Sequence, residues 1–358
     1  MPDSISDQSG PAATLELAGL RRFLRDRGLG DAVGLRTENI SFGHSNEVHL
    51  VHFDGRAWAL RRPPRGPLLP TAHDVMREYR VLSALQETPV PVPRVYAGCD
   101  DPGYIGAPFY LMEHLHGCVI RSPNVPPSQV AHPSFADSPE KRRAVSVGMI
   151  DLLVTLQAVD WRAVGLEKFG RPDGYLERQL KRWTDQLERT LPLTRPLPVM
   201  EKIRDWLGTH LPPPQTATIV HGDFKLDNVM WDADARPQPV ALLDWEMSTL
   251  GDPLADLGWM LTYWTEPIDS EARRGVVSSM EADPGYLSRR AMVELYEEKS
   301  GRAMNHIAFY EAFALFKLAI ILEGSYSRYL SAQADDPVFA TLDVRVPAIA
   351  DIAWQLCR

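Results

Sequence analysis

The sequence predicts an α+β fold, in which a small antiparallel β-sheet lobe precedes a larger, mainly helical lobe. Up to about residue 117 the chain shows three strand-like segments, a helical segment and two more strand-like segments. After that point apolar residues recur mostly at helical spacing. A single strand hairpin within 219–246 interrupts the helical part. We therefore expect two lobes, over 13–117 and 118–358, after a disordered tail at 1–12.

The first lobe is expected to begin with an amphipathic helix in LELAGLRRFLRDRG that ends at Gly28. Strands follow in LRTENISF, SNEVHLVHF and RAWALR, where apolar and polar residues alternate. The first two strands meet at a tight turn around Gly43-His44. The second and third meet at Asp54-Gly55, which is a strong two-residue hairpin signal.

A helix and two strands complete the first lobe. TAHDVMREYRVLSALQET has helical spacing, and the strands PRVYAGCD and PFYLMEHL flank a turn at 101–103. The helical lobe begins with the Pro- and Ser-rich segment RSPNVPPSQVAHPSFADSP. Further helices are expected in EKRRAVSVGMIDLLVTLQAVD and at about 174–190, 198–210, 251–264, 287–300 and 306–332.

Composition excludes several classes of protein. The net charge of −9 argues against a nucleic-acid groove or an anionic membrane surface as a partner. Three scattered cysteines form no disulfide framework, which fits a reducing compartment. No apolar run approaches the ~20 residues of a membrane span, and the N-terminus lacks the features of a signal peptide. We expect a soluble cytoplasmic protein that is a monomer or a weak homodimer.

The hairpin IVHGDFKLDNVMWDADARPQPVALLDWE carries an unusual set of polar side chains. Pairing 229–231 with 240–243 in antiparallel fashion brings Asp244 beside Asn228. Asp223 lies five residues before Asn228, in the loop. Such hard oxygen ligands suit Mg²⁺, and the spacing D-x-x-x-x-N followed by an Asp at a strand end matches the arrangement in kinases.

Each of these residues also has a structural interpretation. Asp223 could cap a turn, Asn228 could form an Asx-turn, and Asp244 could be a solvated strand end. His221 is expected to hold the loop by hydrogen bonds rather than to act as a base. A two-metal phosphoesterase is a rival hypothesis, but such a site needs clustered histidines, and the ten histidines here do not cluster that way.

The chain resembles the aminoglycoside phosphotransferase family in the segment HGDFKLDN, followed by LLDWE and GDPLADLGW. Members of this family are related to protein kinases, but they phosphorylate small molecules. Five further segments occur in the family's order, so that the resemblance covers about 35–330. They are SFGHSNEVHLV, WALRRPP, REYRVLSAL, FYLMEHLHG and RQLKRW. The sequence looks most similar to the branch that is fused to acyl-CoA dehydrogenases in some organisms. The resemblance implies a protein-kinase-like two-lobe fold and the use of ATP and Mg²⁺.

The resemblance also implies roles for the loop residues. Asp223 would orient the substrate hydroxyl and accept its proton, and Asn228 and Asp244 would bind Mg²⁺. Lys225 would lie near the transferred phosphate, where its charge offsets the developing negative charge. The alternative for Lys225 is an exposed loop lysine. Protein kinases carry Arg at the position of Gly222.

The turn SFGHSNE is predicted to bind nucleotide phosphates, because small residues leave its backbone N–H groups accessible. The residues involved are Gly43, His44, Ser45 and Asn46. A basic residue on the third strand should contact the phosphates and pair with Glu78. The family usually has Lys there, whereas this chain offers Arg61, with Arg62 on the opposite face of the strand.

The segment YLMEHLHG is expected to recognise adenine, an assignment that rests on the resemblance alone. The backbone of Glu113, His114 and Leu115 would bind the adenine edge, with Met112 near the base. Asp252 and Asp256 form a second acidic pair on one helix face. We expect Asp252 to cap the helix and Asp256 to brace the catalytic loop.

The predicted function is phosphoryl transfer from ATP to a hydroxyl group of a small molecule. Candidate residues for acceptor binding lie in 119–139 and beyond residue 264. They are Trp264, Glu266, Tyr286, Glu323 and Tyr326. Two alternatives stay open: a non-catalytic nucleotide-binding module of kinase-like fold, and a kinase of hydroxy acids or hydroxyacyl-CoA rather than of aminoglycosides.

Overall fold

The computed structural model describes residues 15–40, 46–64, 74–120, 138–232, 237–269, 273–274, 284–334 and 337–358. The expected tail at 1–12, the turn around Gly43-His44 and most of the Pro- and Ser-rich segment lie outside these residues. The chain divides into two compact units. The first comprises Met1–Glu87 and Val92–His116, and the second comprises Thr88–Pro91 and Gly117–Arg358.

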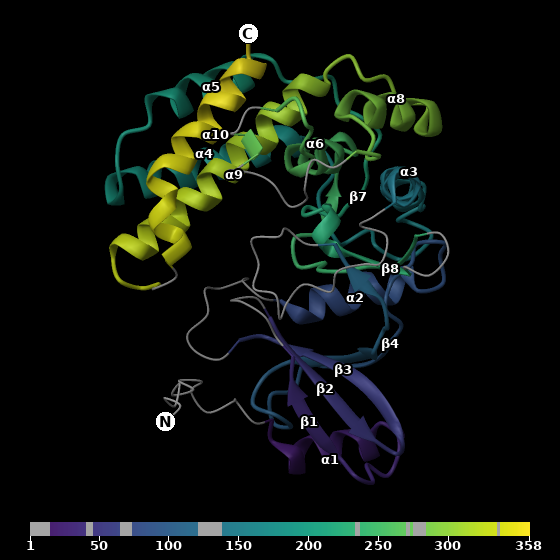
Figure 1. Cartoon of the computed structure of the whole chain (residues 1–358). Helices are drawn as coiled ribbons and strands as arrows, with labels where there is room; N and C mark the ends of the chain where they lie inside the picture. The colour runs from purple at the N-terminus through teal and green to yellow at the C-terminus, as the bar shows by residue number, and fades with distance from the viewer. Residues whose placement is uncertain are drawn as a thin grey trace, which may run out of the picture. The chain divides into compact units, whose positions relative to one another are not determined.

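The first unit is a five-stranded antiparallel sheet with two helices (Figure 1). Its elements are α1 (Leu17–Asp26), β1 (Arg36–Asn39), β2 (Glu47–Phe53), β3 (Arg56–Arg62), α2 (Val75–Leu85), β4 (Val95–Cys99) and β5 (Phe109–Glu113). The predicted element order is confirmed. At the β2–β3 turn Asp54 and Gly55 both have positive φ, 48° and 74°, as the hairpin signal required. The sheet order is β1-β2-β3-β5-β4, so that β5 lies between β3 and β4.

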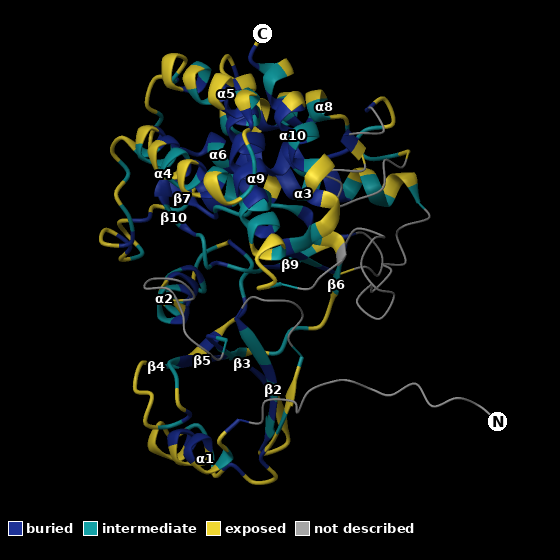
Figure 2. Ribbon diagram, turned by 90° about the vertical axis from the view of Figure 1, so that its left-hand side faces the viewer, coloured by how far each residue is buried: buried dark blue, intermediate teal, exposed yellow. Residues whose placement is uncertain are grey.

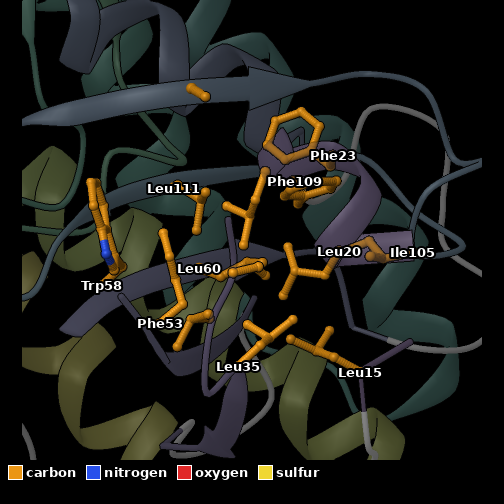
Figure 3. Packing of buried hydrophobic residues seen from close by; sticks show 14 of the residues in the cluster. Leu15, Leu20, Phe23, Leu35, Phe53, Trp58, Leu60, Ile105, Phe109 and Leu111 are labelled. Atoms are coloured by element: carbon orange, nitrogen blue, oxygen red, sulfur yellow. The ribbon is translucent and has the colours of Figure 1, made fainter. Parts of the chain in front are cut away.

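The two faces of this sheet have different partners. On one face α1 contributes Leu20 and Phe23 to an apolar cluster with strand residues such as Leu60 and Phe109 (Figure 3). The rings of Phe23 and Phe109 meet edge to face, with centroids 4.7 Å apart. Because side chains alternate along a strand, Arg61 lies on the other face, where α2 packs. The sheet thus separates an apolar core from a polar face.

The second unit is mainly helical. Its helices are α3 (Pro139–Gln157), α4 (Tyr175–Thr190), α5 (Pro198–Thr209), α6 (Leu254–Tyr263), α8 (Arg289–Ser300), α9 (Ile307–Leu330) and α10 (Leu342–Leu356). Short 3₁₀ turns lie at η2 (Leu191–Leu193), η3 (Leu226–Asn228) and η4 (Pro337–Thr341). All the expected helices are present, whereas α10 was not expected. The sequence did not predict α10 because Pro347, which lies inside the helix, interrupts the apolar pattern of that segment.

Two small sheets also belong to this unit. One pairs β7 (Thr218–Val220) with β10 (Thr249–Gly251), and the other has the order β6-β8-β9. Its strands are β6 (Cys118–Val119), β8 (Val229–Asp232) and β9 (Gln238–Leu242). The hairpin of β8 and β9 was expected from the sequence, but the short strands β6 and β10 were not. They are two and three residues long, too short to show an alternating pattern.

The long helix α9 forms the centre of the second unit. It packs against α10, α6, α4 and α5, and it is drawn almost wholly as buried in its first half (Figure 2). An apolar surface on all sides is typical of a helix that is covered on all sides. Within the described part of the chain, no helix combines the length and the hydropathy that a membrane span needs.

Helices α6 and α9 approach each other closely at Gly258. A Cβ atom placed on Gly258 would lie 2.6 Å from the backbone oxygen of Tyr310, a separation that requires the backbone to move. This close approach brings the side chains of α6 on either side of Gly258 against α9. Gly208 is exposed in α5, and a Cβ atom added there would meet no atom within 4 Å, so this residue offers a matched comparison.

We expect Gly258→Ala to destabilise the protein by about 1–3 kcal/mol, because the added methyl group overpacks the contact between α6 and α9. Gly208→Ala should instead stabilise it by up to ~1 kcal/mol, through the better helix propensity of alanine. Urea unfolding followed by far-ultraviolet circular dichroism measures both. Equal effects of the two substitutions would show that the close approach does not limit the packing.

Candidate active site

The loop after β7 is fixed by a buried carboxylate from α6. Asp256 accepts hydrogen bonds from two successive backbone N–H groups, those of His221 at 2.6 Å and Gly222 at 2.8 Å. Burial raises the pKa of Asp256, and the two N–H donors oppose that effect. The predicted brace between the second acidic cluster and the loop is therefore present.

Gly222 occupies a position that a side chain could not share. Its φ is +84°, and a Cβ atom would lie 2.5 Å from the backbone oxygen of Met247. The left-handed conformation and the lack of space both favour glycine here. The local path of the chain thus explains why the residue is not the arginine of protein kinases.

His221 uses both ring nitrogens to hold the loop. Its Nε2 lies 2.9 Å from the backbone oxygen of Leu243, and its Nδ1 accepts from the backbone N–H of Asp223 at 3.3 Å. An acceptor carbonyl on one side and a donor amide on the other select the neutral tautomer that carries its proton on Nε2. His221 is fully buried, so it acts as a structural link between the loop and the end of the hairpin.

Both carboxylate oxygens of Asp223 are occupied by donors. Trp259 Nε1 donates to Oδ1 at 2.7 Å, Asn228 Nδ2 donates to Oδ2 at 2.8 Å, and Lys225 Nζ lies 3.2 Å from Oδ2. Burial alone would raise the pKa of Asp223, but the positive charges nearby, chiefly Lys225, outweigh it, and the pKa falls below its ordinary value. Asp223 is therefore an oriented, ionised carboxylate.

Lys225 is not an exposed loop lysine, which was the alternative to its predicted role. Its side chain is 21% exposed, and its ammonium group lies 5.2 Å from the centre of the Tyr263 ring. Burial lowers the pKa of Lys225, but Asp223 and Tyr263 act in the opposite direction and raise it overall. The residue remains a fixed positive charge beside the carboxylate.

Asn228 and Asp244 meet at the mouth of the β8–β9 hairpin, as the sequence predicted. Val229 pairs with Leu242, and the backbone N–H of Leu243 donates to the oxygen of Asn228 at 2.8 Å. Asp244 follows directly, with a φ of +62°. A non-glycine residue in this conformation is held there by its surroundings, and such strain is common at functional sites.

The chemistry of this pair fits a magnesium ion. The amide nitrogen of Asn228 faces Asp223, so its amide oxygen is the atom that would ligate a cation, together with the Asp244 carboxylate. No cluster of three or more His, Cys, Asp or Glu side chains suited to a metal occurs among the described residues.

Asp252 has a structural role. It accepts from the backbone N–H of Leu254 at 3.0 Å and from the Tyr310 hydroxyl at 2.9 Å. The first contact holds the start of α6, and the second ties it to α9. Burial raises the pKa of Asp252.

In the first unit, the carboxylate of Glu78 contacts donors from three residues. Arg61 Nε lies 2.7 Å from its Oε2, Tyr110 donates to the same oxygen at 3.2 Å, and Asn46 donates to Oε1. Glu78 is 1% exposed. The structure thus places the predicted Arg61–Glu78 pair together, with Asn46 from the predicted phosphate turn beside it.

Arg62 lies on the opposite face of β3. It is buried, pairs with Glu47 at 3.6 Å, and donates to the backbone oxygens of Pro63 and Ile105. The contact with Glu78 therefore distinguishes Arg61 from Arg62. The other predicted phosphate-turn residues, Gly43, His44 and Ser45, lie outside the described residues.

The predicted adenine-binding segment begins in the inner strand β5, which contains Met112 and Glu113, and continues beyond it. Met112 and His114 are half-buried, as is Leu115, whereas Glu113 is exposed. The backbone N–H of Glu113 donates to the oxygen of Arg94 at 2.8 Å. That N–H group already has a partner, so an adenine contact would involve the other backbone groups of the segment.

Several residues suggested for acceptor binding have structural partners instead. Trp264 is buried and donates from Nε1 to the backbone oxygen of Leu287. Glu266 pairs with Arg289 at 2.7 Å. Glu323 is fully buried and pairs with Arg195, which also lies over the ring of Tyr326.

Sequence reasoning missed three residues of the loop's surroundings: Trp259, Tyr263 and Lys317. Trp259 lies three residues after Asp256, on the same helix face, so the periodicity of α6 held a signal for it. Lys317 stands alone in the apolar run AFALFKLAII, and a lone lysine in such a helix is a signal of a buried role. Tyr263 offered no comparable signal.

Comparisons with known proteins show the family to which the chain belongs. The Phosphotransferase enzyme family matches residues 36–291. Acyl-CoA dehydrogenase family member 10 of Mus musculus is 34% identical over 314 residues, which are 87% of this chain. The chain spans only 28% of that protein's length. This match confirms the resemblance to the branch fused to acyl-CoA dehydrogenases.

Solved structures extend the comparison. A Ralstonia eutropha JMP134 protein, classed provisionally as an aminoglycoside phosphotransferase, is 32% identical, with a TM-score of 0.79 over 96% of this chain and 98% of its own. Aminoglycoside phosphotransferase APH(4)-Ia, solved with AMP-PNP and hygromycin B, shares the fold at 13% identity, with a TM-score of 0.59 over 94% of this chain and 98% of its own. The chain belongs to the phosphotransferase enzyme family and has its kinase-like, two-lobe α+β fold.

Proposed function

We propose that the protein transfers the γ-phosphoryl group of ATP to a hydroxyl group of a small molecule, with the help of Mg²⁺. The observation that carries the proposal is the geometry around Asp223. Its carboxylate is oriented by Trp259 and Asn228, and the charge of Lys225 keeps it ionised. Phosphoryl transfer needs this combination, because it depends mainly on positioning and on charge stabilisation.

In the proposed reaction Asp223 accepts a hydrogen bond from the acceptor hydroxyl and directs its oxygen toward the phosphorus. The lowered pKa of Asp223 makes it a weak base in the ground state. A weak base is sufficient when the transition state is loose, because the hydroxyl proton becomes acidic only as the new P–O bond forms. Lys225 would offset the negative charge that builds up on the transferred group.

Asn228 and Asp244 are the residues that we propose to hold Mg²⁺. When bound, the ion would neutralise charge on the β- and γ-phosphate oxygens. The hairpin holds the two residues next to each other through the Leu243–Asn228 hydrogen bond, so both proposed ligands come from one hairpin.

For the nucleotide, Arg61 is proposed to contact the phosphates while it pairs with Glu78. The pair fixes the direction of the guanidinium group, whose planar, permanently charged fork suits phosphate. The turn at Gly43–Asn46 and the backbone at Glu113–Leu115 complete the proposed nucleotide site. The AMP-PNP complex of the structural relative supports ATP as the donor.

The acceptor is proposed to be a small hydroxyl compound, and aminoglycosides form one class among several. Similarity to acyl-CoA dehydrogenase family member 10 is a reason to test hydroxy acids and hydroxyacyl-CoAs as well. Phosphorus NMR of the protein with MgATP and pools of aminoglycosides, amino alcohols, sugars, hydroxy acids and hydroxyacyl-CoAs tests the proposal. A new phosphomonoester signal should grow as the γ-phosphate signal falls. Failure to bind or consume ATP would overturn the proposal.

We expect Asp223→Asn to lower kcat by about 10²- to 10⁴-fold, because the amide can neither accept the proton nor orient the hydroxyl in the same way. Binding of MgATP should change little. Isothermal titration calorimetry and the NMR assay measure the two effects separately. Asp351→Asn, at an exposed position on α10, is the matched control. Full activity of Asp223→Asn would show that the carboxylate is not needed.

We expect Arg61→Ala to weaken MgATP binding about 10-fold or more, through the loss of a charged hydrogen-bond donor to phosphate. Arg61→Lys, which keeps a positive charge near Glu78, should weaken it much less. Arg62→Lys is the control on the opposite face of β3 and should leave nucleotide affinity unchanged. Calorimetry measures MgATP affinity, and thermal unfolding of the same variants measures the loss of stability that follows from breaking the ion pair with Glu78. Weakened binding in Arg62→Lys alone would assign the phosphate contact to Arg62.

A further inference from the structure

Lys317 is a buried cation in an apolar part of α9, and the reaction described above does not use it. The residue is only 9% exposed, and its neighbours in the run AFALFKLAII are apolar. Burial of an ammonium ion is costly unless the ion is paired or hydrogen-bonded. The contacts of Lys317 therefore indicate what its charge does.

The ammonium group of Lys317 contacts the catalytic loop and Trp259. Its Nζ donates to the backbone oxygen of Gly222 at 2.7 Å and lies 3.7 Å from the centre of the Trp259 ring. The second distance is well within the range of a cation–π interaction, which is strongest with tryptophan and in desolvated surroundings. The same indole donates its N–H to Asp223 Oδ1 at 2.7 Å.

These contacts form a continuous path from Lys317 through Trp259 to Asp223. A cation over the face of an indole draws electron density from the ring, which makes the N–H a stronger donor. The contact with Gly222 fixes the backbone one residue before Asp223. Lys317 thus acts on both the position of the carboxylate and the donor that holds it.

We propose that Lys317 and Trp259 are positioning residues for phosphoryl transfer: the Lys317 ammonium ion strengthens and orients the indole N–H that fixes Asp223. The inference rests on the proposed function, in which Asp223 orients the acceptor hydroxyl. It differs from a purely structural role because it requires the charge of Lys317, and not only its volume, to change the behaviour of Asp223.

The charged and titratable groups around Lys317 come from three elements. The loop supplies Asp223 and Lys225, α6 supplies Asp256, and α4 supplies Arg182 and Tyr175. The two carboxylates favour the charged ammonium, whereas Arg182 and Lys225 oppose it. Tyr175 stays neutral because burial raises the pKa of its phenol.

Burial outweighs the two carboxylates and lowers the pKa of Lys317 to about 8, from an ordinary value of 10.5. The ammonium ion should therefore lose its proton just above neutral pH, and the hold on Asp223 should weaken. Between these two values the unfolded chain binds more protons than the folded chain, so the contribution of this group to stability rises with pH. Deprotonation of Lys317 therefore does not unfold the protein between these two pH values, and a loss of activity there would have a cause other than unfolding.

The indole N–H resonance of Trp259 reports on the path directly and requires no acceptor. Proton–nitrogen NMR of the whole protein should show this resonance at low field, identified by its absence in Trp259→Phe. It should move as pH rises through about 8. In Lys317→Met, which keeps the length of the side chain and removes the charge, the resonance should lie at higher field and should not titrate.

Kinetics with an accepted hydroxyl compound from the pools provide the second readout. Lys317→Met should lower kcat about 10- to 100-fold with little change in KM for MgATP, because misplacement of the carboxylate affects the chemical step. The alkaline fall in kcat near pH 8 should be lost. Lys317→Arg, which keeps a cation at all relevant pH values, should recover part of the activity at neutral pH and also lack the alkaline fall.

Lys181→Met, at an exposed position on α4, is the control and should change neither readout. If Lys317 and Trp259 act on one path, the kcat loss in Lys317→Met/Trp259→Phe should be smaller than the product of the two single losses. An indole resonance that is unchanged in Lys317→Met, or an alkaline fall that persists in it, would overturn the inference. If wild-type protein transfers no phosphate, the proposed function fails, and the NMR titration still decides the role of Lys317.

Discussion

The loop after β7, which carries Asp223, depends on one buried contact, in which the Asp256 carboxylate accepts hydrogen bonds from the N–H groups of both His221 and Gly222. Two bonds to successive residues fix the direction of the chain as well as its position. Gly222 can then adopt its left-handed conformation against Met247, and Asp223 turns toward Trp259. Since α6 supplies both Asp256 and Trp259, a single helix sets where the loop lies and where its carboxylate points.

Each unit is organised around such a carboxylate, but the two differ in their partners. Glu78 of the first unit is paired with a cation, Arg61, whereas Asp256 receives two neutral backbone donors. Burial accordingly raises the pKa of Asp256 despite its hydrogen bonds. Removal of one partner from a buried ion pair typically costs about 3–5 kcal/mol, so Glu78 links the stability of the first unit to the residue proposed to bind phosphate.

Patterns within one segment of the sequence predicted the structure of that segment. Alternation identified the strands and the Asp54-Gly55 turn, but the insertion of β5 between β3 and β4 depends on pairing across the sheet, which no short pattern records. The positions of Asn228 and Asp244 could be predicted because one hairpin holds both. Trp259 and Lys317 were missed: helix periodicity and an isolated lysine in an apolar run signal burial, but they do not identify the contact partners, which lie 36 and 95 residues away in the chain.

The position of α9 in the sequence has a consequence for where the protein can be divided. The match to the Phosphotransferase enzyme family ends at residue 291, and α9 begins at Ile307. A fragment cut at the end of the match would keep every recognisable motif, yet α6 would lose the helix against which Gly258 packs. The folding unit is therefore longer than the region that the family model matches, and a fragment of this chain that is meant to fold should extend beyond α9.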